Sequence, residues 1–187
     1  MPSASLLKWQ NVRLPNLAHV DGQCVASLAL VPANPALVDE NYRGYVLLLS
    51  AHFQGFCRDL YAECAQIVVS KTRVTLQPLI QGQFTSNLRL DHGNPTVKSL
   101  KEDFERFDFP LRLSTADPAN PARIALLDRM NKWRNTAAHH GNPPAGIPLG
   151  LPSLNDWRNA CGGLATSLDG IMYTELRKIL RRQPWIP

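Results

Sequence analysis

Residues 41–68 read NYRGYVLLLSAHFQGFCRDLYAECAQIV, and this stretch decides the fold class. Its apolar residues recur three or four positions apart, at Tyr42, Val46, Leu49, Phe53, Phe56, Leu60, Cys64 and Ile67. This spacing places them on one face of an α-helix as a continuous apolar stripe. The helical pattern covers residues 35–70, and so long a helix is typical of helical bundles.

A second long helix is expected to begin at Asn120 and Pro121, because asparagine is a good N-cap and proline suits the first helical position. Gly141 is a suitable end for it. A third is expected to begin at Ser153, where Asp156 completes a variant of the capping box. Both helices carry apolar residues at helical spacing.

The third helix contains Gly162 and Gly163 near its middle. Each glycine costs about 1 kcal/mol relative to alanine in a helix interior. The close approach of another backbone would offset that cost, so this pair predicts a tight contact with a neighbouring helix.

The remaining segments contain many prolines and glycines. Residues 71–95 predict a connector with a short helix over residues 79–88, and residues 96–107 predict a short amphipathic helix. Residues 1–36 contain Pro2, Pro15, Pro32 and Pro35, and they predict an irregular N-terminal arm that packs on the core. The expected architecture is all-α, a bundle of three long helices and one or two short ones over residues 37–187.

The composition is that of a globular chain, with 187 residues, 44% hydrophobic and 19% charged. A net charge of +5 is compatible with nucleic-acid binding. The four cysteines show no metal-ligand spacing, so we expect buried thiols and no metal site. No apolar run is long enough to span a membrane, which predicts a cytoplasmic protein without a membrane partner.

Residues 134–139, RNTAAH, hold the candidate chemistry at the end of the second long helix. Arg134 offers a fixed positive fork for a phosphate, and His139 can move protons near neutral pH. Such a pair can cleave RNA without a cofactor, through attack of the 2′-hydroxyl and formation of a 2′,3′-cyclic phosphate. Acid and base must lie on opposite sides of the phosphorus, which favours a homodimer with the site at its interface.

The spacing of the pair allows a second interpretation. Positions five apart on a regular helix differ by about 140°, so either the last turn is distorted or Arg134 reaches around the helix. Cations near a helix C-terminus are favoured by about 0.3–1 kcal/mol. Arg134, His139 and His140 could therefore be only helix-end cations, and the spacing alone favours this reading.

The run from Arg134 through Asn135 to His139 resembles the signature of the HEPN superfamily, an arginine, a polar residue, three residues and a histidine. Those proteins are small helical bundles. The segments HFQGF (52–56) and DLYAE (59–63) are similar to their first helix. GNPT (93–96), before a short helix ending in DFERF (103–107), resembles a connector in some of them. The resemblance spans residues 37–182.

The resemblance implies a metal-independent endoribonuclease that acts as a dimer. Many members are toxins of toxin–antitoxin or anti-phage defence systems, often neutralised by a nucleotidyltransferase-type antitoxin. By match to the motif, Arg134 and His139 would be catalytic, and Asn135 would orient the histidine or the phosphate. Some members lack activity, so a catalytically inactive module that binds nucleotide, RNA or protein is the alternative. A structural helical subunit is the third possibility.

Further residues are secondary candidates. His52, Asp59 and Glu63 share a face of the first long helix, where they could line a cleft against the helix of Arg134 and His139. A solvated helix face explains Asp59 and Glu63 equally well, and a lone histidine such as His52 is more often partly buried with its hydrogen bonds satisfied. His140 is a candidate phosphate contact. A weaker set that could hold the RNA backbone is the basic end of the last helix: Arg177, Lys178, Arg181 and Arg182.

Overall fold

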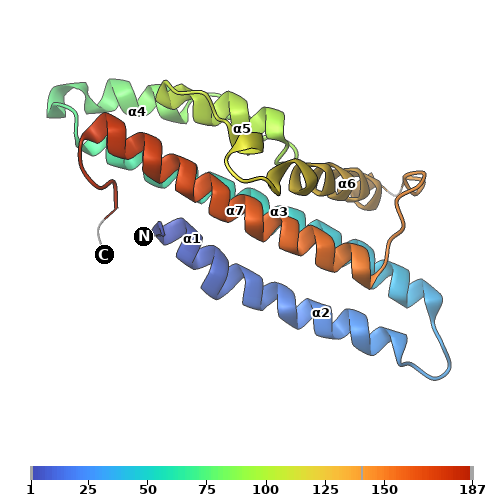
Figure 1. Ribbon diagram of the computed structural model, residues 1–187. Coiled ribbons are helices and arrows are strands. Elements are labelled where there is room, and N and C mark those ends of the chain that lie inside the picture. The colour runs from blue at the N-terminus through green and yellow to red at the C-terminus, as the bar shows by residue number, and fades with distance from the viewer. Residues whose placement is uncertain (1, 140, 186–187) are drawn as a thin grey trace.

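The computed structural model describes residues 2–139 and 141–185 (Figure 1). Within these ranges every regular element is a helix, and no strand is present. The all-α fold predicted from the sequence is therefore confirmed. No helix in this part of the chain combines the length and the apolar character needed to cross a membrane.

The longest helix, α3 (Pro35–Ser70), is the centre of the bundle. Asn34 caps it, because its side chain accepts a hydrogen bond from the Leu37 N–H (3.1 Å), and Pro35 pre-sets the first turn. The stripe seen in the sequence lies in the core, where these residues are fully buried: Val46, Leu49, Phe53, Phe56, Leu60 and Cys64. The stripe therefore sets which face of α3 points inward.

The N-terminal segment is helical, whereas its prolines predicted an irregular arm. It consists of α1 (Ala4–Lys8), a π-helical turn (Trp9–Arg13) and α2 (Leu14–Leu28). The N–H of Leu14 bonds to the carbonyl of Trp9, five residues back, so the turn before Pro15 is wider than an α-helical turn. A proline lacks an N–H and crowds the preceding turn, and a π turn relieves both conflicts. The helix therefore continues through Pro15.

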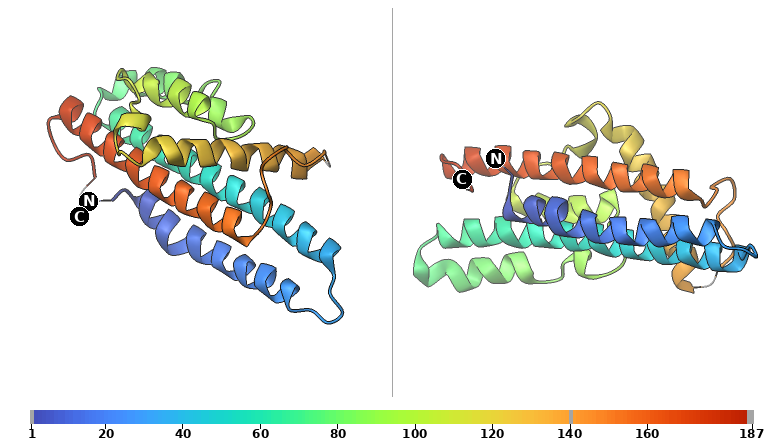
Figure 2. Two further views of the ribbon diagram at one scale, coloured as in Figure 1. Left: turned by 45° about the vertical axis from the view of Figure 1, so that its right-hand side comes forward. Right: turned by 90° about the horizontal axis from the view of Figure 1, so that it is seen from below.

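The long helices form an up-and-down bundle (Figure 2). In both figures α2 and α6 (Asn120–His139) run in one direction, while α3 and α7 (Leu151–Leu180) run in the other. The N-terminal helices share the hydrophobic core, to which they contribute Trp9, Leu17 and Cys24. All four cysteines are buried and free, as predicted, and burial raises the pKa of each thiol.

The connector between α3 and α6 contains two short α-helices. The first, α4 (Gln77–Thr85), begins two residues before the predicted range because Pro78 occupies its first turn. The second, α5 (Val97–Phe104), begins with a capping box in which Thr96 and Ser99 exchange hydrogen bonds between side chain and backbone (2.9 and 3.1 Å). A 3-10 turn at Glu105–Phe107 extends it to the end predicted from the sequence.

The start of α7 differs from the prediction. The helix begins at Leu151 after Gly150, with Pro152 in its first turn, and not at Ser153. The Ser153 hydroxyl donates to the Pro148 carbonyl (2.8 Å) and therefore does not act as an N-cap. A proline is favoured at the first helical positions, and this preference outweighs the weak Ser153 and Asp156 box.

The two glycines of α7 differ in what they contact. A Cβ added at Gly163 would overlap the Arg123 guanidinium, whereas one at Gly162 would meet only Trp9 Nε1, at 4.0 Å. A side chain of α6, and not a neighbouring backbone as expected, therefore approaches α7 here. The guanidinium is held by Asp117 Oδ2 (2.7 Å) and Asn120 Oδ1 (2.9 Å).

This contrast predicts opposite effects for two matched substitutions. We expect Gly162→Ala to raise the free energy of unfolding by about 1 kcal/mol through helix propensity. We expect Gly163→Ala to lower it by about 1 kcal/mol, because the added methyl group displaces Arg123 and the loss of its two hydrogen bonds outweighs the same gain in helix propensity. Urea unfolding of both variants measures the difference, and equal stabilities would contradict this account of Gly163.

Candidate active site at the end of α6

The last turns of α6 display the motif on the surface. Met130, Trp133 and Ala137 are buried, and the Trp133 Nε1–H donates to the Ile147 carbonyl (2.9 Å). These contacts set the rotation of α6 about its axis. As a result Asn135 and His139 are exposed.

The structure brings the three motif residues toward one face of the helix. Asn135 and His139 are four positions apart, which separates them by about 40° around the helix. Arg134 is half-buried, and its Nη1 donates to Asn135 Oδ1 (3.4 Å). The guanidinium therefore leans toward Asn135 and the face that Asn135 shares with His139.

The end of α6 is closed by a backbone hydrogen bond of the kind that commonly ends a helix. The Gly141 N–H bonds to the Thr136 carbonyl (3.0 Å), five residues back instead of four. His139 makes no hydrogen bond or ion pair with any other residue that the structure describes. Its imidazole is therefore open to a ligand.

Asn135 is oriented by a residue far away in the sequence. Asn94, in the connector before α5, donates through Nδ2 to Asn135 Oδ1 (2.8 Å). Arg134 also donates to that oxygen, and a guanidinium can only donate, so the oxygen side of the Asn135 amide faces both groups. The Nδ2 of Asn135 remains as a donor that bonds no other described residue.

One further cation lies on this face. Lys132 is seven positions before His139, so it lies about 20° from it around the helix, and its side chain is exposed. It forms no ion pair within the described ranges. Lys132 is not among the residues predicted from the sequence, although its spacing from His139 was a usable signal.

Asp59 and Glu63 are directed to the N-terminal helices and not to α6. The Glu63 carboxylate accepts from the backbone N–H groups of Ala4 (3.0 Å) and Ser5 (2.9 Å), at the start of α1. The suggestion that these carboxylates line a cleft against the motif helix is therefore wrong. The N-cap contact is electrostatically favourable for a helix start, which explains Glu63 without catalysis.

Asp59 forms ion pairs with Lys8 (2.9 Å) and Arg13 (2.8 Å). Burial acts to raise the pKa of the Asp59 carboxyl, but hydrogen bonds from Lys8 and Arg13 outweigh it and lower the pKa overall. A Cβ at Gly55 would overlap the Arg13 guanidinium, so this glycine leaves the space through which Arg13 reaches Asp59. The cluster ties the N-terminal helices to α3.

His52 belongs to the same region of α3. It is half-buried, and burial followed by the positive charge of Arg13 lowers its pKa. It has no hydrogen bond to another described residue, so the expected satisfied histidine is not observed. His140 lies outside the described residues.

The basic residues of α7 are exposed, but they lie at the end of the bundle opposite the motif (Figures 1 and 2). They are Arg177, Lys178, Arg181 and Arg182. The 30 residues of α7 span about 45 Å, which separates this end from the loop that follows α6. Lys178 is paired with Glu175 (2.7 Å). The structure therefore does not join these cations to the motif.

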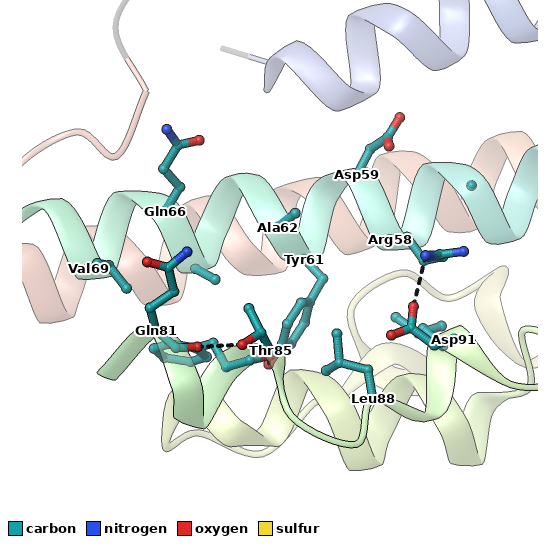
Figure 3. Close-up of a pocket in the computed structure, with 14 residues that line it drawn as sticks. Arg58, Asp59, Tyr61, Ala62, Gln66, Val69, Gln81, Thr85, Leu88 and Asp91 are labelled. Atoms are coloured by element: carbon teal, nitrogen blue, oxygen red, sulfur yellow. Dashed lines mark hydrogen bonds and ion pairs between the residues drawn. The ribbon is translucent and has the colours of Figure 1, made fainter. Parts of the chain in front are cut away.

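A groove of about 740 Å³ lies away from the motif, between α3 and α4 (Figure 3). An ion pair between Arg58 and Asp91 (2.9 Å) borders it, and Tyr61 lines it. The Tyr61 hydroxyl donates to the Phe84 carbonyl (3.0 Å), and burial raises its pKa to about 12. No group of three or more His, Cys, Asp or Glu side chains within residues 2–139 and 141–185 is arranged to hold a metal ion.

An all-α bundle with an arginine, an asparagine and a histidine at the exposed end of a helix defines a protein of the HEPN class. The model of the RiboL-PSP-HEPN family matches residues 27–174, and the chain belongs to this family. No curated protein and no solved structure matches the chain.

Proposed function

We propose that this protein is a metal-independent endoribonuclease. The observation that carries the proposal is the shared exposed face of α6, where Arg134 leans onto Asn135 and His139 is open. Asn94, in a second segment of the chain, orients the Asn135 amide. If Arg134 and His139 were only helix-end cations, this contact would not be needed. Membership of the RiboL-PSP-HEPN family supports the same function.

The reaction needs the groups of this face and one further histidine. The 2′-oxygen of RNA forms a bond to the adjacent phosphorus while His139 takes its proton. Arg134 and the Asn135 Nδ2 stabilise the negative charge on the phosphorane oxygens. The bond from phosphorus to the 5′-oxygen then breaks, and that oxygen takes a proton from a second, protonated histidine. The products are a 2′,3′-cyclic phosphate and a 5′-hydroxyl.

A homodimer supplies the second histidine in this proposal. Asn135 and His139 are exposed and Arg134 is half-buried, so one chain forms only one wall of a site. A two-fold axis beside α6 would bring the partner subunit's His139 to the opposite side of the phosphorus, as the chemistry requires. The arrangement makes each protomer alone inactive.

The cellular role follows from the family resemblance. Such an enzyme would act in the cytoplasm as a toxin or an anti-phage defence protein. A nucleotidyltransferase-type antitoxin is the corresponding partner, and a small reading frame of that kind beside the gene supports this role.

The proposal is tested with wild-type protein and a labelled single-stranded RNA of mixed sequence, in the presence of EDTA. We expect cleavage products that carry 2′,3′-cyclic phosphate ends, and no cleavage of the same RNA with 2′-O-methyl groups. Light scattering should give the mass of two chains. Tight binding of RNA without any cleavage would replace the proposal with a catalytically inactive RNA-binding module.

A further inference from the structure

We propose that Asn94 is a positioning residue of this site, which holds the Asn135 amide so that its Nδ2 points to the RNA phosphate. The inference rests on the proposed function and extends it to the connector before α5. Asn94 itself does not touch the substrate. It acts through Asn135, from which it is separated by 41 positions in the sequence.

Both hydrogens of the Asn94 side-chain amide are donated to acceptors on α6. Its Nδ2 donates to the Asn135 side-chain oxygen (2.8 Å) and to the Asn131 backbone carbonyl (3.5 Å). Both partners are acceptors, so a flipped Asn94 would place its own oxygen against two other oxygens. The Asn94 amide therefore has one orientation, and it imposes one orientation on Asn135.

The backbone of Asn94 is held from several sides. Its carbonyl accepts from the Thr96 N–H (2.9 Å) and from the Ser99 hydroxyl (3.2 Å), both in the capping box of α5. Asn131 donates through Nδ2 to the next carbonyl, that of Pro95 (3.2 Å). Gly93 turns the chain just before, with a φ of +78° that other residues rarely adopt. A group fixed on both sides in this way can orient its neighbour.

The side-chain oxygens of Asn94 and Asn131 take no part in this set of hydrogen bonds. Asn94 Oδ1 and Asn131 Oδ1 are buried and accept no hydrogen bond within the described part of the chain. An acceptor that bonds no protein group adds no stability through such a bond, so the donors of Asn94 are what tie its side chain to α6. Asn94 therefore fits a residue kept for the orientation of Asn135.

The test is a double-mutant cycle of Asn94→Ala, Asn135→Ala and the double variant. Two quantities are measured: the kcat/KM for cleavage, and the Kd for a 2′-O-methyl RNA that cannot be cleaved. We expect Asn94→Ala to lower kcat/KM and to weaken binding by about tenfold, the size of one lost hydrogen bond. In the Asn135→Ala background the same change should have no effect. Urea unfolding should show that Asn94→Ala remains folded, with a free energy of unfolding lower by no more than about 1.5 kcal/mol.

Two further variants complete the design. Asn94→Asp keeps the size of the side chain but replaces the donor with an acceptor, so it should impair binding at least as much as alanine. Asn16→Ala removes an exposed asparagine on α2 and should change neither quantity.

Each outcome decides between the two proposals. Additive effects of the two substitutions, or an Asn94→Ala variant equal to wild type, would overturn the role of Asn94 while leaving cleavage intact. Coupled effects on RNA binding by a wild type that does not cleave would support the role of Asn94 and overturn the ribonuclease. A wild type that neither cleaves nor binds RNA overturns both.

Discussion

Replacing His139 with alanine is expected to slow RNA cleavage by about 10²–10⁴-fold, because the reaction loses its proton-transfer group. The fold should not change, since the side chain is exposed and makes no hydrogen bond to another described residue. Initial rates of cleavage with EDTA present measure the effect. RNA binding should change far less than the rate, because the histidine acts in the transition state.

The matched control is His19→Ala, which removes another exposed histidine, on α2. It should cleave at the wild-type rate. Arg134→Lys extends the experiment, because lysine keeps the charge but lacks the planar fork that binds a phosphate and reaches Asn135. Equal cleavage by the wild type, His139→Ala and Arg134→Lys would exclude this face of α6 as the active site.

The second large effect concerns stability. We expect Trp9→Ala to lower the free energy of unfolding by about 3 kcal/mol, at the lower end of the range for a buried tryptophan. The Trp9 ring is 1% exposed and packs against Phe53 (5.9 Å) and Phe56 (5.8 Å) of α3. Its Nε1–H is buried without a partner among the described residues, and losing that unpaired donor offsets part of the cost.

Urea unfolding monitored by circular dichroism measures this loss. Leu7→Ala is the control, because Leu7 belongs to the same helix but is 44% exposed and should change stability by less than about 1 kcal/mol. A stable Trp9→Ala protein would show that the N-terminal helices are dispensable for the core. The result matters because the family match begins only at residue 27.

The sequence predicted the parts of the fold that depend on local signals. The stripe from Val46 to Cys64 placed the buried face of α3 correctly, and the Asn120 and Pro121 signal placed the start of α6. The N-terminal helix was missed because Pro15 reads as a helix breaker. A single π turn accommodates this proline, and the local sequence pattern contains no signal that predicts such a turn.

For the candidate site, too, local sequence signals predicted some features and missed others. Arg134, Asn135 and His139 were predicted from the resemblance of six consecutive residues to a family motif, which is a local property of the sequence. Asp59 and Glu63 also have helical spacing, but their partners are Lys8, Arg13 and the first turn of α1. Spacing shows which residues share a face, and it does not show which neighbouring element covers that face.

The sequence by itself determined that this chain is an all-α bundle and that its candidate site residues lie at the end of α6. Periodicity and capping act within one or two helical turns, so they can be recognised without knowing the rest of the chain. Only the tertiary structure decided that Asn94 holds the Asn135 amide. Hydrogen bonds between distant segments depend on how the helices pack, because packing alone brings a connector within 2.8 Å of a helix 41 positions away.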